Sequence, residues 1–324
     1  MNYLNLFGQN GEKAWKVSQI SLGCDYYGLE VPEEQAFRIM DAYYDKGGNF
    51  LDTAHVYGQK VVDTVSFSEV TVGKWVEANK LQGKVVISDK GAHPDRRNMQ
   101  VSRLNYQNAR NDLFSSLEAL KTDCVDIWFL HRDNPAMPVS EIVDMVSEFV
   151  DKGYIKKLGA SNWTSKRLQA ANDYARENGK HGFSISQIQW SLAISTPESW
   201  NDPTLVCMDD AQQEWYQEKQ FPVMVFSPQA RGLFSKVIQN GVDSLSEKVK
   251  ERFLLDKNLG RIEKCRQLSE RLHMNPAGVC LSYLTSAPFP VIPVIGCSSP
   301  EQVVDSLRSA DDRISESDRR FLVE

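Results

Sequence analysis

The sequence has few of the residues on which metal sites and disulfide frameworks depend. Its six cysteines are scattered without a CxxC pair, and its five histidines form neither an HxH nor an HExxH motif. Zinc sites typically use such closely spaced cysteine and histidine ligands. We therefore expect reduced thiols and no bound metal. A metal-dependent barrel hydrolase is an alternative function, but no motif in the sequence supports it.

Long apolar runs and an excess of basic residues are also absent. No apolar stretch reaches the roughly 20 residues that cross a bilayer, and residues 1–16 lack the apolar core of a signal peptide. The formal net charge is −6, whereas a nucleic-acid-binding domain normally presents a basic face. These absences predict a cytoplasmic protein that binds neither membranes nor nucleic acids. They do not distinguish a monomer from a homo-oligomer.

What the sequence does contain is a regular alternation of strand-like and helix-like segments. Apolar runs, many of them rich in Val and Ile, lie at 17–23, 49–52, 84–88, 125–130, 156–161, 184–190, 222–227 and 291–296. Amphipathic segments follow at 32–46, 67–79, 105–121, 139–152, 164–178, 209–219, 257–272, 276–286 and 300–308. Strands of this composition are typical of parallel sheets that are covered on both faces.

Eight such strand–helix units predict an α/β fold, a single (β/α)8 TIM barrel over residues 1–324. A serine three residues before an aspartate predicts a short closing helix within 315–324. The alternative is an open, doubly wound sheet of the Rossmann type. It is disfavoured because no GxGxxG motif follows the first strand.

Polar residues at the ends of three consecutive strands predict an active site. Asp52 ends the second strand, Lys90 follows the third, and His131 follows the fourth. Tyr57 comes one short loop after Asp52. In a parallel barrel the carboxyl ends of all strands converge on one face, so these four side chains are expected to meet there. Taken singly, each also has a structural alternative, as a loop cap, a packed aromatic residue, a solvated lysine or a structural histidine.

The four residue types together suit the protonation of a carbonyl oxygen. A free phenol has a pKa of about 10, which is high for an acid at neutral pH. The ammonium of Lys90 is expected to lower the pKa of Tyr57, and Asp52 to keep that ammonium charged. His131 is expected to orient the carbonyl, while hydride comes from elsewhere. The HRD that begins at His131 also occurs in kinases, but the other kinase motifs are absent.

At this point the sequence resembles the aldo-keto reductase superfamily. The matching motifs are LDTAHVYG (51–58), ISDKG (87–91), FLHRD (129–133), LGASNW (158–163), SQIQW (186–190), FSPQARGL (226–233) and VIGCSSPEQVVDSL (294–307). They span nearly the whole chain in family order, and they look closest to the aryl-alcohol-dehydrogenase-like and potassium-channel β-subunit-like branches. The resemblance implies a barrel that binds extended NADP(H) across its C-terminal face.

The resemblance also implies roles for individual residues. Tyr57 matches the general acid, and Lys90 and Asp52 match the two residues that adjust the pKa of that acid. His131 matches the residue that orients the carbonyl. The implied contacts to the cofactor are Cys24, Asp52, Ser161, Asn162, Gln187, Phe226, Ser227, Pro228, Gln229, Arg231, Gly296, Ser298, Gln302 and Ser306. Among them Phe226 matches the aromatic residue that stacks on the nicotinamide.

The adenosine end departs from the better-known family pattern. Many members carry a lysine, an arginine and an asparagine where this chain has Gly296, Gln302 and Ser306. In those members the lysine and the arginine hold the 2′-phosphate of the cofactor. Lys236 and Arg252 are candidates to supply a positive charge instead. From their positions in the sequence alone, however, both are expected to be ordinary surface residues. We expect NADPH as the cofactor, with NADH as the alternative.

The sequence says least about the substrate. The loops at 192–208 and 234–245 are expected to shape the pocket, with Trp163 and Trp200 at its rim. The resemblance implies a small-molecule carbonyl substrate, an aldehyde or ketone of sugar or aromatic type, that is reduced to an alcohol. A protein that binds NADP(H) as a redox sensor or interaction partner with little turnover is the alternative. Turnover, and its loss in Tyr57→Phe, would separate the two.

Overall fold

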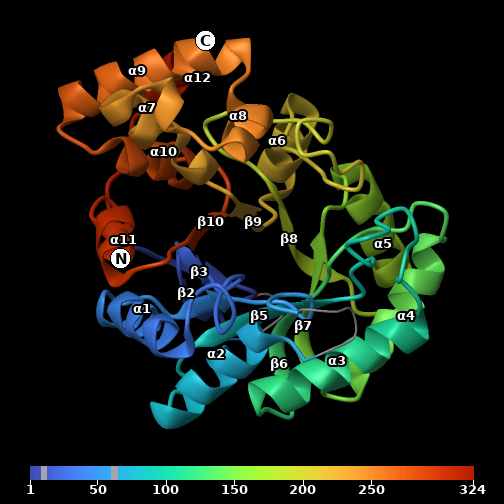
Figure 1. The fold of residues 1–324 in the computed structure, drawn as a ribbon. Helices are drawn as coiled ribbons and strands as arrows, with labels where there is room; N and C mark the ends of the chain where they lie inside the picture. Colours follow the sequence, from blue (N-terminus) through green and yellow to red (C-terminus); the bar gives the residue numbers. More distant parts are fainter. Residues whose placement is uncertain (9–12, 60–64) are drawn as a thin grey trace.

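The chain forms a closed barrel of eight parallel strands. The computed structural model describes residues 1–8, 13–59 and 65–324. Around the barrel the strand order is β10-β3-β4-β5-β6-β7-β8-β9, as Figure 1 shows from one side. The strands are β3 (Ser21–Gly23), β4 (Phe50–Asp52), β5 (Val86–Gly91), β6 (Val125–Leu130), β7 (Ile155–Ser161), β8 (Phe183–Gln189), β9 (Val223–Phe226) and β10 (Val291–Gly296). The predicted (β/α)8 barrel is confirmed.

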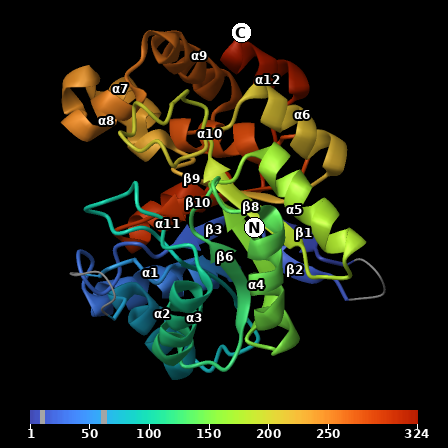
Figure 2. The ribbon, with the colours of Figure 1, turned by 90° about the vertical axis from the view of Figure 1, so that its right-hand side faces the viewer.

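Helices alternate with the strands and surround them (Figures 1 and 2). They are α1 (Glu33–Asp45), α2 (Phe67–Ala78), α3 (Tyr106–Leu120), α4 (Val139–Asp151), α5 (Ser165–Glu177), α6 (Asp210–Lys219), α9 (Asp256–Leu272), α10 (Pro276–Thr285), α11 (Pro300–Leu307) and α12 (Glu316–Val323). Helix α12 is the predicted closing helix.

Several helices begin where a polar side chain caps them. The side chains of Ser66, Asn105 and Thr164 each accept a hydrogen bond from a backbone N–H three residues later, at the starts of α2, α3 and α5. These N–H groups have no partner within the helix, and serine, asparagine and threonine are the preferred caps for them. The caps fix where each barrel loop ends.

The predicted first strand, 17–23, is divided between two sheets. Its first part belongs to β2 (Trp15–Ser18), which pairs antiparallel with β1 (Tyr3–Leu6), a strand that the sequence analysis missed. Its second part is β3 of the barrel, after a bend at Gln19 and Ile20. Leu6 of the hairpin packs on residues inside the barrel such as Phe129, so the hairpin covers the barrel interior.

The connection between β9 and α9 contains more structure than predicted. The loop expected at 234–245 is mostly helix α7 (Leu233–Asn240), and helix α8 (Glu247–Phe253) follows it. Phe234 and Phe253 are buried in a cluster with residues of β9, α9 and α10. This burial explains the helices, because their apolar sides need a partner surface.

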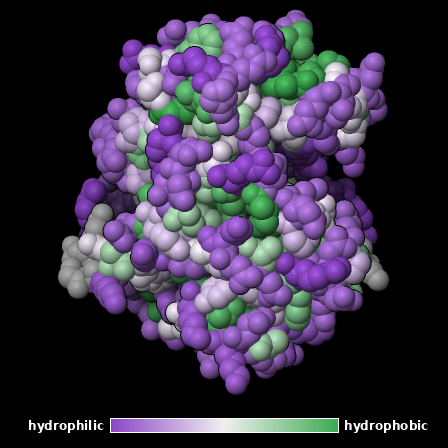
Figure 3. Space-filling view, turned by 90° about the vertical axis from the view of Figure 1, so that its left-hand side faces the viewer, coloured by the Kyte–Doolittle hydropathy of each residue, from purple (hydrophilic) through white to green (hydrophobic). Residues whose placement is uncertain are grey.

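The surface in Figure 3 is mainly hydrophilic, and its hydrophobic residues form small separate patches. Within the described ranges, no helix combines the length and the apolar character needed to cross a membrane.

Candidate active site

A cavity of about 1010 Å³ opens at the carboxyl ends of the barrel strands. Most of the residues predicted for the site line it, which brings together segments from the whole chain. Those residues are Asp52, Tyr57, His131, Ser161, Asn162, Gln187, Phe226, Ser227, Pro228, Gln229, Arg231, Gly296, Ser298, Gln302 and Ser306. The exceptions are Lys90, which lies behind Tyr57, and Cys24.

Lys90 is fully buried, and its ammonium has three oxygen neighbours. Its Nζ donates to Asp52 Oδ2 at 2.7 Å, to the carbonyl oxygen of Thr53 at 2.8 Å and to Tyr57 Oη at 3.4 Å. An ammonium has three hydrogens and accepts no hydrogen bond. The phenol oxygen therefore accepts from Lys90, which leaves the hydroxyl hydrogen of Tyr57 free to be donated into the cavity.

Asp52 is held on both of its oxygens. While Oδ2 accepts from Lys90, Oδ1 accepts from Ser88 Oγ at 2.7 Å and from Gln187 Nε2 at 2.9 Å. Burial opposes the charge on Lys90, but the carboxylate of Asp52 and the phenol of Tyr57 outweigh it, so the pKa of Lys90 is raised. The lysine stays charged, as the sequence predicted. Gln187 was expected only at the cofactor, and it also positions Asp52.

The pKa of Tyr57 differs from the expectation. Burial raises it to about 12, even though the neighbouring ammonium of Lys90 lowers it in part. The prediction of a net lowered pKa was therefore wrong for this cavity, because desolvation of the phenolate exceeds the effect of one cation. The consequence is that Tyr57 carries its proton throughout the neutral range, as an acid must.

His131 is an uncharged neighbour of Tyr57. Their ring centroids are 5.7 Å apart and the rings are nearly perpendicular. Burial, followed by the nearby His93 and Arg132, lowers the pKa of His131 well below its ordinary value. A neutral imidazole can donate one hydrogen bond from one nitrogen, which suits a contact with a carbonyl oxygen.

Asn162, Phe226 and Trp200 also line the cavity. Asn162 Nδ2 donates to Ser161 Oγ at 3.0 Å, and its Oδ1 accepts from the backbone N–H of Val206 at 3.2 Å. The ring of Trp200 meets that of Phe226 edge-on, with centroids 5.9 Å apart. Phe226 thus offers an aromatic surface at the end of β9, where a flat ring can be bound.

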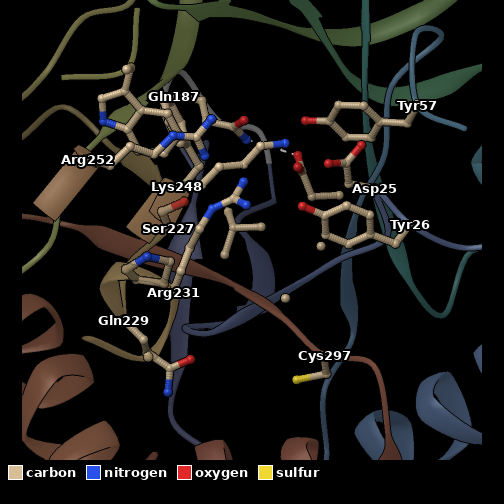
Figure 4. Close-up of a pocket in the computed structure, with 18 of the residues that line it drawn as sticks. Asp25, Tyr26, Tyr57, Gln187, Ser227, Gln229, Arg231, Lys248, Arg252 and Cys297 are labelled. Atoms are coloured by element: carbon tan, nitrogen blue, oxygen red, sulfur yellow. Dashed lines mark hydrogen bonds between the residues drawn. The ribbon is translucent and has the colours of Figure 1, made fainter. Parts of the chain in front are cut away.

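Three cations line the wall beyond Trp200. They are Arg231, Lys248 and Arg252, and Figure 4 shows their side chains on the opposite side of the cavity from Tyr57. The guanidinium of Arg252 lies 4.2 Å from the Trp200 ring centroid. Its Nη1 is buried and has no hydrogen-bond partner within the described ranges. Burial and the charge of Arg231 lower the pKa of Arg252. Crowded, unsatisfied cations of this kind fit the phosphates of a dinucleotide.

The far end of the cavity is polar but carries little positive charge. Gln229 Nε2 donates to Ser306 Oγ at 3.3 Å, and Gln302 Oε1 accepts from the backbone N–H of Ser298 at 2.7 Å. Of the two candidates for the missing cation, Arg252 lies against Trp200 instead, whereas Lys236 lines the cavity. A side chain at Gly296 would meet open space, so the backbone is accessible to a ligand.

Two expected positions are corrected by the structure. The thiol of Cys24 is fully buried and packs in the core, and its chain neighbours Gly23 and Asp25 line the cavity instead. Trp163 is not a rim residue. It is fully buried against Phe183, with ring centroids 5.0 Å apart. Both lie in strand-exit segments where successive side chains point alternately to the mouth and to the core.

Sequence analysis missed several residues with ionisable side chains that line the cavity, namely Asp25, His93, Arg96, Arg132, Asp202 and Lys248. Arg132 directly follows His131, so the FLHRD motif that indicated the histidine also contained this arginine. Asp202, which bonds Arg132, lies 70 positions later in a different loop. No spacing rule in a single sequence connects the two.

Known proteins resemble this chain over nearly its whole length. Residues 19–321 match the aldo/keto reductase family. The chain is 27% identical over 323 residues to the uncharacterized oxidoreductase YrpG of Bacillus subtilis (strain 168), covering 96% of this chain and 93% of that protein. It is 26% identical over 281 residues to the aryl-alcohol dehydrogenase GME11368 of Pestalotiopsis microspora, covering 85% and 68%.

Two further matches are an enzyme and a solved structure. The aryl-alcohol dehydrogenase (NADP(+)) of Phanerodontia chrysosporium is 29% identical over 182 residues, covering 53% of this chain and 46% of that protein. A crystal structure of a thermostable aldo-keto reductase has a TM-score of 0.72 at 22% identity, covering 99% of this chain and 98% of that one, which shows a common fold. The family match includes nearly every residue of the barrel and its cavity. The chain therefore belongs to the aldo/keto reductase family, and it is an oxidoreductase built on a (β/α)8 barrel.

Proposed function

We propose that the protein is an NADP(H)-dependent reductase that converts an aldehyde or ketone to an alcohol, with Tyr57 as the proton donor. The observation that carries the proposal is the arrangement around Lys90. Its three N–H bonds are directed to Asp52, Thr53 and Tyr57, so the phenol accepts one hydrogen bond and keeps its own hydrogen for the cavity.

The proton step follows from these contacts. As a carbonyl oxygen gains negative charge, Tyr57 donates its proton to it, and the ammonium of Lys90 stabilises the phenolate that forms. Asp52 keeps Lys90 charged and in place through the 2.7 Å contact. The neutral ring of His131 donates to the same carbonyl oxygen and fixes its direction.

The chain also has groups suited to a bound nicotinamide dinucleotide, which supplies the hydride when present. Phe226 offers a flat surface to the nicotinamide, and Asn162 lines the same cavity. Arg231, Lys248 and Arg252 neutralise the pyrophosphate charges, which supports the assignment because Arg252 Nη1 otherwise lacks a partner within the described ranges. The remaining predicted contacts, from Ser227 to Ser306, keep their proposed role at the cofactor.

NADPH is proposed over NADH, and a relative named for NADP(+) supports this choice. Gln302 and Ser298 are exposed polar groups that can bond a 2′-phosphate. Neither is charged, so we expect the preference for NADPH to be modest.

A titration followed by a kinetic assay tests the proposal. The purified protein is titrated with NADPH and with NADH while its tryptophan fluorescence is recorded, because Trp200 lies in the cavity. Consumption of the bound cofactor is then followed with a panel of aldehydes and ketones. We expect tight binding and turnover. Cofactor binding without turnover on any carbonyl would favour a redox sensor or interaction protein, and absence of cofactor binding would refute both.

A further inference from the structure

The buried ring nitrogen of His131, Nδ1, has no hydrogen-bond partner in the part of the chain that the structure describes. The backbone of the same residue is held on both sides. Its N–H donates to the carbonyl oxygen of Gly91 at 3.0 Å, and its carbonyl oxygen accepts from Arg132 Nη1 at 2.9 Å. A histidine that acts through one nitrogen is normally oriented by a hydrogen bond to the other. The direction of the His131 ring therefore depends on the rings that pack against it.

Two rings confine that of His131. The ring centroid of Tyr57 lies 5.7 Å from that of His131, and the centroid of His93 lies 4.5 Å from it. Both meet it nearly edge-on, at 77° and 71°, an arrangement that is attractive between aromatic rings. Tyr57 is the proposed proton donor, whereas the buried His93 has no step in the proposed reaction. The nearer of the two rings is thus the one that the proton transfer leaves unexplained.

His93 is itself fixed in place and uncharged. Its Nδ1 lies 2.6 Å from the carbonyl oxygen of Pro94, which only accepts, so Nδ1 carries the hydrogen. The carbonyl oxygen of His93 accepts from Arg103 Nη1 at 3.0 Å. Burial lowers the pKa of His93 to about 3, so the ring is neutral at physiological pH. An anchored neutral ring can support His131 without adding a charge beside the reacting carbonyl.

The residue before His93 has an uncommon backbone conformation. Ala92 has a φ of 58°, in the left-handed region that residues with a side chain rarely adopt. Its N–H donates to Asp112 Oδ2 at 2.8 Å, and Asp112 Oδ1 accepts from Arg103 Nη2 at 2.9 Å. Helix α3, which carries Asp112, therefore holds the chain around His93. Such outliers persist only where their surroundings hold them, and they cluster at functional sites.

We propose that His93 is a positioning residue, which holds the ring of His131 in the direction and the tautomer that donate a hydrogen bond to the carbonyl oxygen. Buried donors without an acceptor are rarer than buried acceptors without a donor, so Nδ1 of His131 lacks the hydrogen and Nε2 carries it. His93 acts through His131, not through a contact of its own with the substrate. The inference rests on the proposed reductase function and adds a residue to it.

Magnetic resonance of isotope-labelled histidine rings tests this role without turnover. The signals of the ring nitrogens distinguish the two tautomers, and their loss in His131→Asn identifies those of His131. We expect one tautomer, with hydrogen on Nε2, in the unchanged protein and a mixture of both in His93→Ala. His93→Phe, which restores a flat ring, should restore the single tautomer. His181→Ala is the matched control, because His181 is exposed and bonded to Asp151. Unchanged His131 signals in folded His93→Ala would overturn the inference.

Steady-state kinetics separates positioning from substrate contact. A misdirected donor slows the chemical step, so kcat for an accepted carbonyl should fall about tenfold in His93→Ala. The dissociation constant for NADPH should stay unchanged, and His93→Phe should recover most of the lost kcat. A raised KM with unchanged kcat is the signature of lost uniform binding. That result would make His93 a substrate contact and would overturn its role at His131.

A double variant shows whether His93 acts through His131. His131→Asn removes the ring that His93 orients, so adding His93→Ala should then change kcat by less than about twofold. A second loss of about tenfold would show independent roles and overturn the inference. Thermal unfolding verifies that each variant is folded, and His93→Gln, which also removes the ring, replaces His93→Ala if that variant does not fold. If the unchanged protein reduces no carbonyl, the reductase proposal fails, and the tautomer comparison alone decides whether His93 orients His131.

Discussion

Lys90 Nζ lies 3.4 Å from Tyr57 Oη and 2.7 Å from Asp52 Oδ2, so one buried ammonium links the phenol to the carboxylate. The relationship is directional, because the lysine can only donate. Because Tyr57 Oη accepts the hydrogen bond from Lys90, the hydroxyl hydrogen of Tyr57 is the one available for transfer.

Removing the ammonium should impair the chemical step. In Lys90→Met the phenolate that forms at Tyr57 loses its stabilising cation, and Asp52 loses its partner. We expect kcat for carbonyl reduction to fall by about 10²–10⁴-fold, the range typical of acid–base groups. Lys250→Met is the control and should keep full activity, because Lys250 is partly exposed on α8, pairs with Glu247 and does not line the cavity. Circular dichroism distinguishes a lost reaction from a lost fold. A variant that retains more than a tenth of the activity would contradict the role of Lys90.

The pH dependence should differ between the two reaction directions. Burial keeps the pKa of Tyr57 near 12 and that of His131 well below its ordinary value. Neither group changes its charge between about pH 6 and pH 9, so kcat/KM for reduction should be constant there. Alcohol oxidation needs the phenolate as a base and should rise with pH up to about tenfold per unit. A fall in the reduction rate centred near pH 7 would show that another group controls the reaction.

A cation at the adenosine end should change the choice of cofactor. Gln302 is exposed at the start of α11 and bonds Ser298. Gln302→Arg places a guanidinium where a 2′-phosphate is expected, and such charge-assisted pairs are strong. We expect the ratio of kcat/KM for NADPH to that for NADH to rise about tenfold. Gln217→Arg, on exposed α6, should leave the ratio unchanged. An equal effect of both substitutions would show a general charge effect instead of a local contact.

A buried carboxyl pair should make stability depend on pH. The carboxyl groups of Glu69 and Asp89 lie within hydrogen-bonding contact of each other, and the hydroxyls of Ser116 and Ser66 at Glu69 and the backbone of Lys90 at Asp89 offset the effect of burial only in part. Two carboxylates cannot bond each other, so the pair holds a proton. Burial raises the pKa of Glu69 from 4.5 to about 7, and it raises the pKa of Asp89 well above its ordinary value. Between pH 4.5 and about pH 7, Glu69 has lost its proton in the unfolded chain and retains it in the native protein. The free energy of unfolding therefore falls as pH rises through this range.

Glu69→Gln removes that pH dependence. The free energy of unfolding of the variant, relative to the unchanged protein, should increase from pH 4.5 to pH 7 by up to about 3 kcal/mol and then level off. Denaturant unfolding at a series of pH values measures this difference. Glu177→Gln at the exposed end of α5 serves as the control. A difference that is constant with pH would mean that Glu69 is ionised in the native protein.

Much of the fold, and the meeting of the candidate catalytic residues, could be predicted because both follow repeated patterns. The barrel has one apolar run per strand, and Asp52, Lys90 and His131 each occur at a strand's end, where parallel topology brings them together. The β1–β2 hairpin was missed because Tyr3–Leu6 is only four residues long, although the Asn10-Gly11 pair that precedes Trp15–Ser18 is a turn signal that could have indicated it. The Arg132–Asp202 ion pair in the cavity wall was missed for a different reason, since these two residues meet only through the packing of two loops.

The net pKa of Tyr57 also lay beyond the sequence. The presence of a lysine could be predicted, but the depth of burial that outweighs its charge depends on the completed cavity. The same holds for Trp163, whose burial depends on its contact with Phe183. Sequence patterns therefore indicate which groups meet, whereas desolvation and rotamer direction require the structure.

Substitution of the phenol tests the central claim most directly. Tyr57→Phe removes one oxygen atom and leaves the ring, Lys90 and the cofactor cavity in place. We predict that NADPH consumption with an accepted carbonyl falls at least about thousandfold while the dissociation constant for NADPH stays within about twofold of the original. A phenylalanine variant that binds NADPH and reduces the carbonyl at a rate within tenfold of the unchanged protein would contradict the assignment of Tyr57 as the proton donor.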